Sequence, residues 1–320
     1  MILGHRKTDM NRYKTPLRYP GGKQKLSPFL SEIVEQNNLV GGHYVEPYAG
    51  GAGVAMELLI SGKASHVHLN DSCKRIYAFW RSVLTKSDEL CALIVRASLT
   101  VEEWRRQQAI FAAPEQSDEL TLGFATFYLN RCNRSGILSG GLIGGLRQDG
   151  DWRMDARFPR NELIRRIEVI ASKAKAISLR NWDAERFIRE YLPRVPDDAL
   201  VYLDPPYFKK ADRLYMNHYS ADDHERIATV IQQSIKHKWI VSYDNAPEIS
   251  KYYLKRRSFE YDLQYNASKA YMGKELIIVS DDLILPASSN VLGVDTALRN
   301  VAPQFLTPKA WTVERTVAVV

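Results

Sequence analysis

The chain has few cysteines: three among 320 residues, namely Cys73, Cys91 and Cys132. Their spacing is unpaired, which argues against a disulfide framework and against a zinc site, because both need matched groups of ligands. We therefore expect no bound metal. Sparse, unpaired cysteines are typical of a protein that works in a reducing cytoplasm.

Long apolar runs are missing as well. The first 14 residues contain no apolar core of a secretory signal, and no stretch approaches the length needed to cross a bilayer. No internal repeat or low-complexity tract stands out. We expect a cytoplasmic protein with no membrane partner.

The composition is that of a globular protein, with 45% hydrophobic and 25% charged residues. A length of 320 residues suits one large domain with an insertion, or two domains. The net charge of +7 and the isoelectric point near 9.1 favour a polyanionic partner, although many mildly basic proteins have none.

Strands and helices alternate in two parts of the chain, which predicts βαβ units and a mostly parallel sheet. The last two strands are expected to form an antiparallel hairpin at one edge. The expected strands are 44–46, 66–69, 176–179, 199–203, 239–243, 259–265 and 275–279, and the expected helices are 54–60, 73–84 and 222–235. We therefore predict an α/β fold with a mostly parallel, Rossmann-like sheet.

The alternation stops between residues 85 and 174. Helical periods at 102–111, 120–129 and 162–170 surround a segment rich in glycine and arginine, which predicts an inserted, mostly helical domain built on a loop or hairpin. The expected domains are thus 1–84 with 175–285, and the insertion 85–174. The tail, 286–320, has no usable periodicity, and its role stays open.

A rigid turn follows the apolar run 199–203. Its residues are Asp204, Pro205, Pro206 and Tyr207. Two prolines end the strand and stiffen the turn, because each fixes φ and lacks an N–H donor. Open α/β sheets bind ligands at this carboxyl end of their strands. The Asp204 carboxylate and Pro205 carbonyl suit an exocyclic amino group, and the Tyr207 ring suits a nucleobase. A proline-rich turn with an incidental acid is the alternative.

A glycine-rich turn, 46–53, lies between an expected strand and an expected helix. Its sequence, EPYAGGAG, lets the backbone approach a ligand but lacks the dinucleotide pattern G-x-G-x-x-G. Asp71 follows the next strand, 21 positions after Gly50 (71 − 50), where an acid can accept hydrogen bonds from ribose hydroxyls. The alternatives are a turn without a ligand and a simple helix cap at Asp71.

Two further segments are candidates for binding. The turn 20–23, PGGK, brings backbone and Lys23 towards a ligand, or else it is a flexible loop with a solvated lysine. In the insertion, 131–180 holds 11 Lys and Arg against 5 Asp and Glu, an excess of +6 (11 − 5). Such a run is often only a solvated face. The best candidates for contacting DNA in a groove are Arg131, Asn133, Arg134 and Ser135.

Together these segments resemble the Dam-type family of DNA adenine-N6 methyltransferases, over about residues 15–282. Five segments occur in the family's order: PGGK at 20–23, EPYAGGAG at 46–53, Asn70-Asp71, NWDAERFI at 181–188 and DPPY at 204–207. FYLNRCNRSG at 127–136 is similar to the start of the family's target-recognition hairpin.

The resemblance implies that S-adenosylmethionine is the cofactor. It implies contacts at Tyr19, where some members have tryptophan, and at Lys23, Asp71 and Asp204, with Asp183 against the adenine ring. The glycine turn would face the methionine part of the cofactor. Its residues in that role are Glu46, Pro47, Tyr48, Gly50 and Gly51.

The same resemblance implies a mechanism. A target adenine is flipped out of double-stranded DNA, Asp204 and the Pro205 carbonyl orient its amino group, Tyr207 stacks on it, and the methyl group transfers in line. Other substrates stay open: RNA, cytosine-N4 or protein glutamine. So does a catalytically inactive DNA-binding regulator; a nicotinamide oxidoreductase is disfavoured because G-x-G-x-x-G is absent. A cognate restriction or defence protein is a candidate partner, and DNA binding would associate the protein with the nucleoid.

Overall fold

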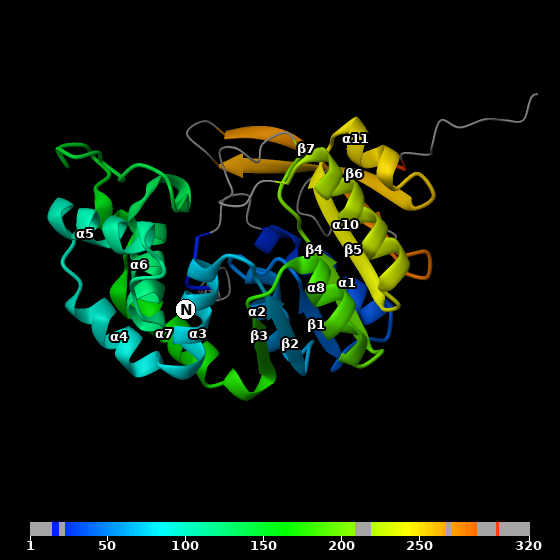
Figure 1. The fold of residues 1–320 in the computed structure, drawn as a ribbon, viewed down its shortest axis with the longest axis horizontal. Coiled ribbons are helices and arrows are strands. Elements are labelled where there is room, and N and C mark those ends of the chain that lie inside the picture. Colours follow the sequence, from blue (N-terminus) through cyan, green and yellow to red (C-terminus); the bar gives the residue numbers. More distant parts are fainter. Residues whose placement is uncertain (1–14, 19–22, 209–218, 267–269, 287–298, 301–320) are drawn as a thin grey trace, which may run out of the picture.

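The computed structural model describes residues 15–18, 23–208, 219–266, 270–286 and 299–300. Within them, eight strands form one sheet in the order β3-β2-β1-β4-β5-β7-β6-β8 (Figure 1). The strands are β1 (His43–Glu46), β2 (His66–Asn70), β3 (Ile177–Arg180), β4 (Ala199–Leu203), β5 (Lys238–Asp244), β6 (Arg257–Asn266), β7 (Ala270–Val279) and β8 (Arg299–Asn300).

Strands β1 to β5 are parallel to one another, while β6, β7 and β8 are antiparallel to their neighbours. The sheet reverses its order at β1, which lies between β2 and β4. The predicted Rossmann-like α/β fold and the antiparallel edge hairpin are confirmed. Each of the seven predicted strands is present, with bounds within a few residues except at the hairpin, where β7 begins earlier than predicted.

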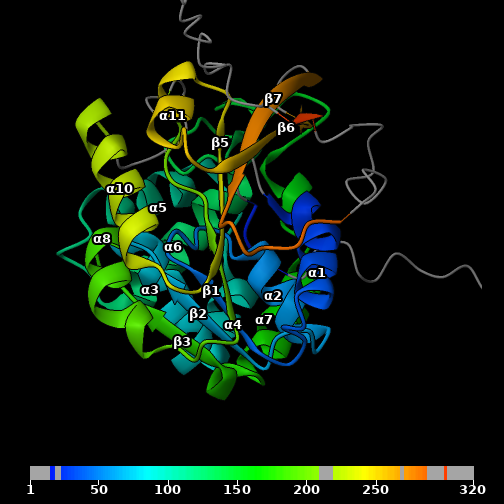
Figure 2. The same cartoon turned by 90° about the vertical axis from the view of Figure 1, so that its right-hand side faces the viewer.

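Alternate residues of the central strands face two different cores, because side chains of a strand point to opposite faces. Tyr44 and Leu200 belong to a core with α1 (Ser27–Gln36) and α2 (Gly53–Ile60). Val45 and Val201 belong to a second core with helix α10 (Ala221–Ser234) and the short helical segments α8 (Ala184–Arg186) and η5 (Phe187–Tyr191). Figure 2 shows α1 and α2 on one side of the sheet and α8 and α10 on the other.

The insertion forms a helical layer beside the sheet (Figure 1). Its elements are α4 (Ser87–Arg96), α5 (Val101–Ala112), α6 (Glu119–Cys132), the 3-10 turn η3 (Met154–Arg157) and α7 (Arg160–Ala171). Helix α6 packs closely on α3 (Lys74–Thr85), since a Cβ at Gly123 would lie 2.6 Å from the Ala78 carbonyl oxygen. The helices predicted in the insertion correspond to α5, α6 and α7, and those predicted at 54–60, 73–84 and 222–235 correspond to α2, α3 and α10. No helix was predicted at α4 or at α1.

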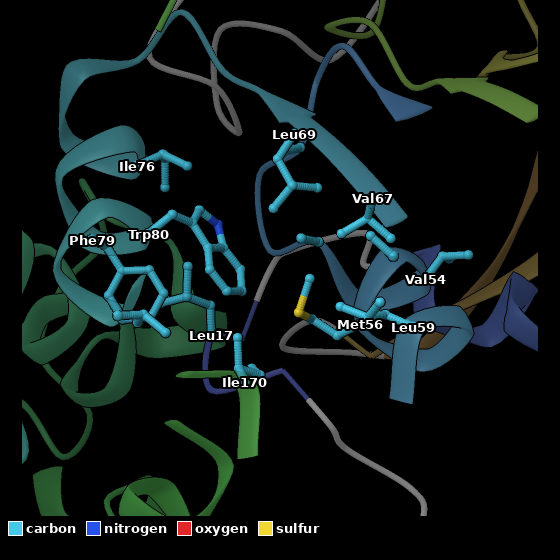
Figure 3. Packing of buried hydrophobic residues seen from close by; sticks show 14 of the residues in the cluster. Leu17, Val54, Met56, Leu59, Val67, Leu69, Ile76, Phe79, Trp80 and Ile170 are labelled. Carbon is cyan, nitrogen blue, oxygen red and sulfur yellow. The ribbon is translucent and has the colours of Figure 1, made fainter. Parts of the chain in front are cut away.

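The core under the first face of the sheet continues into the insertion. Figure 3 shows where these parts meet, with Val67 and Leu69 of β2, Phe79 and Trp80 of α3, and Ile170 of α7 in one cluster. Residues 85–174 are therefore packed on the sheet and on α3 through buried apolar contacts. Among the described helices, none has the length and apolarity that a membrane crossing requires.

Candidate active site

Three neighbouring parallel strands deliver the predicted site residues to one edge of the sheet. β4 ends at Leu203 and leads directly to Asp204, β1 leads into the glycine turn, and β2 leads to Asp71. Because β2, β1 and β4 are adjacent and parallel, their carboxyl ends meet at the position where the strand order reverses. The predicted residues thus converge on the ligand-binding edge of an open α/β sheet.

Asp204 is held by groups from two other elements. The Ser242 hydroxyl on β5 donates to Asp204 Oδ1 at 2.9 Å, and Lys23 Nζ lies 3.5 Å from the same oxygen. The side chain is 20% exposed. Burial raises the pKa of this carboxyl to about 6, against the opposing pull of the Lys23 ammonium. Asp204 is therefore mostly ionised at neutral pH and can accept hydrogen bonds from an amino group.

Tyr207 lies in the interior. Its side chain is fully buried, its hydroxyl donates to Glu275 and accepts from Lys23 Nζ at 2.9 Å, and the same Nζ lies 5.1 Å from the ring centroid. The structure thus differs from the expected picture of a ring ready to stack on a base, because other groups cover the ring. Stacking on Tyr207 requires the surroundings of the ring to open.

Lys23 is a buried member of this site, since its side chain is 6% exposed and it pairs with Asp204 and Glu275. Burial acts to lower the pKa of Lys23, but these two carboxylates outweigh it and raise that pKa. The alternative of a solvated lysine is wrong. Tyr19 and the adjoining residues 20–22 lie outside the described residues.

Sequence reasoning missed Glu275. This carboxyl is fully buried on β7 and accepts hydrogen bonds from Lys23, Tyr207 and Tyr261. The sequence held one signal for this role, a charged residue at the start of the apolar run ELIIV at 275–279. A carboxylate buried in a strand is almost always paired, so this position indicated a buried partner.

The glycine turn is fixed from both sides. The Gly50 N–H donates to Asp71 Oδ2 at 2.8 Å, and the Gly50 carbonyl accepts from Trp80 Nε1 at 2.9 Å. The Gly51 carbonyl accepts from the Thr15 hydroxyl. Gly50 has a φ of 45°, a conformation that favours glycine. The turn is therefore rigid and tied directly to the acid that follows β2.

The two carboxylate oxygens of Asp71 hold two different backbone segments. Its Oδ1 accepts from the Cys73 N–H at 2.9 Å in the turn before α3, which has no side-chain cap, while Oδ2 holds the glycine turn. Burial raises the pKa of Asp71 to about 6, although these two backbone hydrogen bonds favour the ionised form. Each oxygen keeps a lone pair that can accept a ligand hydroxyl.

The remaining residues of the turn line the same edge. Glu46 is buried and accepts from the Ala55 N–H at 3.2 Å; burial raises its pKa to about 8. The Pro47 carbonyl accepts from Asn70 Nδ2 at 3.0 Å, and the Tyr48 hydroxyl lies 3.2 Å from that of Tyr219. Glu46 is therefore mostly protonated at neutral pH.

Asp183 lies at a different kind of position. Its exposed carboxylate accepts from the Glu185 N–H at 2.9 Å and the Arg186 N–H at 3.4 Å, so it caps the first turn of α8. The segment before it is bound to the sheet, because the Trp182 N–H donates to Asn70 Oδ1 at 3.0 Å. Asp183 is thereby near the end of β2 and free to accept further hydrogen bonds on its exposed side.

The four expected DNA-contacting residues separate into two kinds. Arg134 is exposed, and Ser135 is half-buried in a tight turn with a φ of 56°. Arg131 is 6% exposed, and its Nε donates to the Arg157 carbonyl at 2.6 Å. Burial and the neighbouring arginines lower the pKa of Arg131 to about 9. Arg131 thus supports the insertion in this structure.

Asn133 is fully buried, contrary to the expectation of a side chain that contacts DNA in a groove. Its Oδ1 accepts from Trp104 Nε1 at 2.8 Å, and its Nδ2 donates to the carbonyls of Ile137 and Leu138 at 3.0 and 2.9 Å. Both donors are therefore used inside the protein. Asn133 closes the loop after α6, and a base contact would cost these hydrogen bonds.

A model of the D12 class of N6 adenine-specific DNA methyltransferases matches residues 19–267. The chain belongs to this family. A search of curated proteins returned no match. The D12-class methyltransferase has no group of three or more His, Cys, Asp or Glu side chains placed to hold a metal ion in the ranges that the structure describes.

Solved structures of other methyltransferases resemble this D12-class chain weakly. The rRNA methyltransferase aviRa from Streptomyces viridochromogenes is 12% identical over 78% of this chain and 82% of its own, with a TM-score of 0.33. A Listeria monocytogenes protein classed as a class I S-adenosylmethionine-dependent methyltransferase is 12% identical over 89% of this chain and 66% of its own, with a TM-score of 0.37. These likenesses add nothing to the family assignment.

Proposed function

We propose that this D12-class methyltransferase uses S-adenosylmethionine to methylate the N6 amino group of adenine flipped out of double-stranded DNA. The convergence of Asp204, Asp71 and the glycine turn at one sheet edge carries this proposal. The cofactor supplies an electrophilic methyl group on a sulfonium. The protein must bind it, orient the amino group and exclude water.

The cofactor would lie across the ends of β1 and β2. Asp71 would accept hydrogen bonds from ribose hydroxyls, and the glycine turn, with Glu46, Pro47, Tyr48, Gly50 and Gly51, would face the methionine part. Tyr19 and Asp183 complete the proposed contacts. The rigid hydrogen bond from the Gly50 N–H to Asp71 supports this placement, because it ties the two binding segments together.

Asp204 is the proposed catalytic acceptor. Its carboxylate, with the Pro205 carbonyl, would bind both hydrogens of the amino group and turn the nitrogen lone pair towards the methyl group. Pro206 stiffens the turn, and the buried Tyr207 follows it. The chemistry needs no protein nucleophile, since positioning and electrostatics govern an in-line transfer.

Target recognition is assigned to the insertion, residues 85–174. Its exposed arginines include Arg134, Arg147, Arg153 and Arg157. Arginine binds phosphates and guanine edges well, so this surface suits a duplex. Arg134 and Ser135 are the proposed DNA contacts, while Arg131 and Asn133 shape the loop that presents them. A restriction or defence partner and a cytoplasmic, nucleoid-associated location remain predictions.

The deciding experiment incubates the purified protein with S-adenosylmethionine carrying a labelled methyl group and mixed-sequence double-stranded DNA. Hydrolysis to nucleosides should place the label in N6-methyldeoxyadenosine. Parallel reactions with RNA and with protein should stay unlabelled. Label in N4-methyldeoxycytidine, RNA or glutamine would assign another substrate, and DNA binding without transfer would point to an inactive regulator.

A further inference from the structure

Glu275 is a buried charged residue to which the proposed methyl-transfer chemistry assigns no role. It lies on β7, where it is the register partner of Asp244 on β5 and of Tyr261 on β6. The side chain is fully buried. Burial alone would raise the pKa of Glu275, but Lys23 together with the tyrosine hydroxyls lowers it, so this carboxyl is ionised at neutral pH.

Both carboxylate oxygens of Glu275 are used. Oε1 accepts from the Tyr207 hydroxyl, and Oε2 accepts from Lys23 Nζ and from the Tyr261 hydroxyl. Lys23 Nζ in turn lies 2.9 Å from the Tyr207 hydroxyl and 3.5 Å from Asp204 Oδ1. Glu275 therefore holds the last residue of the 204–207 turn directly, and the first one through Lys23.

We propose that Glu275 is a positioning residue for methyl transfer, which fixes Tyr207 and, through Lys23, sets the position of Asp204. This inference rests on the proposed function. Glu275 would not touch the reacting groups itself but would act through Tyr207 and Lys23. Two carboxylates share one ammonium here, so Lys23 cannot pair fully with Asp204 while Glu275 is charged. Asp204 is thereby left able to accept the hydrogens of an incoming amino group.

The charges around Glu275 give this proposal a distinctive readout. The titratable groups that act on it are Lys23, Asp204, Tyr202, Tyr207 and Tyr261, and its register partner on β5 is the buried Asp244. Burial is the main cause that raises the pKa of Asp204, and the negative charge of Glu275 adds to it, whereas Lys23 opposes it. Removing the Glu275 charge should therefore lower the pKa of Asp204.

The test compares Glu275→Gln with wild type in steady-state methylation of DNA across pH. We expect kcat to fall by at least about tenfold at the pH optimum, because the acceptor geometry is lost, while KM for DNA changes by less than about twofold. The acid limb of the pH profile should move to lower pH. A merely structural defect would not shift that limb.

Glu260→Gln is the matched control. Glu260 lies on the same hairpin, accepts from Asn245 Nδ2 at 2.6 Å and lies 3.5 Å from Lys274 Nζ. It points to the opposite face of β6 from Tyr261, the residue that bonds to Glu275. Its kcat and acid limb should match wild type. Wild-type kcat and an unmoved acid limb in Glu275→Gln would overturn the proposal.

Glu275→Asp keeps the charge but shortens the side chain. It should show a lower kcat with the wild-type acid limb, and it carries the test if Glu275→Gln does not fold by circular dichroism; wild-type kcat in Glu275→Asp would contradict the positioning role. If wild type itself transfers no methyl group to adenine, the proposed function fails, which is a different result from an active wild type with an equally active Glu275→Gln.

Discussion

Asn130 and Arg18 hold each other through two reciprocal hydrogen bonds. The Arg18 N–H donates to Asn130 Oδ1, and Asn130 Nδ2 donates to the Arg18 carbonyl, both at 2.7 Å. Asn130 lies on α6 of the insertion, and Arg18 shortly precedes Lys23 of the active site. A Cβ at Gly136 would lie 2.3 Å from the same carbonyl oxygen, so the loop after α6 also closes on Arg18.

Asn130→Ala should lower the free energy of unfolding by about 1–3 kcal/mol, because it removes both partly buried hydrogen bonds to the Arg18 backbone. Chemical denaturation with urea measures the change. Thr126→Val on the same helix is the control: Thr126 is also buried, but its hydroxyl bonds only to the Leu122 carbonyl of its own helix. It should cost less than about 1 kcal/mol. Equal losses in both variants would contradict the importance of this contact.

Asp204→Ala should reduce methyl transfer by at least about 100-fold, because the amino group loses its charged acceptor. DNA binding should remain measurable in a filter-binding assay, since Asp204 does not belong to the recognition surface. Asp197→Ala offers a matched control at the exposed turn before β4. If Asp204→Ala transfers labelled methyl groups at the wild-type rate, the catalytic assignment is wrong.

The sheet and its ligand-binding edge were predictable because their signals are local. Each apolar run is followed at once by its own turn residues, as with 199–203 and Asp204, or β2 and Asp71. Periodicity also indicated α5, α6 and α7. No helix was predicted at α4 or at α1, which has a proline in its first turn.

The rest of the site could not be predicted because it depends on contacts between distant segments. Glu275 meets Lys23, 252 positions away, and Tyr207, 68 positions away. Asn133 is buried by Trp104 of α5, 29 positions away, so its polar character gave no hint of its interior role. Residue type suggested a chemistry at these positions, but only packing decides which side chains are accessible.

Arg134→Ala and Arg131→Ala should have different effects. Arg134 is exposed, so its loss should weaken DNA binding and, if it contacts phosphate, reduce the slope of log affinity against log salt by about 1. Arg131 is buried and bound to the Arg157 carbonyl, so its loss should mainly reduce stability, by about 1–3 kcal/mol.

Fluorescence anisotropy at several salt concentrations and thermal unfolding separate the two effects. Arg165→Ala is the control, because this exposed arginine of α7 forms an ion pair with Glu162 of its own helix. It should bind DNA as wild type does. Unchanged affinity and specificity in Arg134→Ala would remove this loop from the proposed recognition surface.

The affinity for S-adenosylmethionine should fall as the pH drops below about 6. Only the ionised carboxylate of Asp71 accepts two hydroxyl hydrogens, and burial raises the pKa of this carboxyl to about 6. Acidification from pH 7.5 to pH 5 protonates it and removes an acceptor. Isothermal titration calorimetry at these two pH values measures the loss, which should reach about tenfold, one factor of ten per pH unit below the pKa.

Asp71→Asn supplies the control for this pH dependence. The amide keeps one acceptor oxygen but does not titrate, so the variant should bind the cofactor more weakly at pH 7.5 and lose less affinity on acidification than wild type does. Asp204 also titrates near pH 6, because burial raises its pKa as well, and it accounts for any loss that persists. If both proteins lose the same factor of affinity on acidification, the Asp71 carboxylate does not cause the pH dependence, and its proposed contact with the cofactor is wrong.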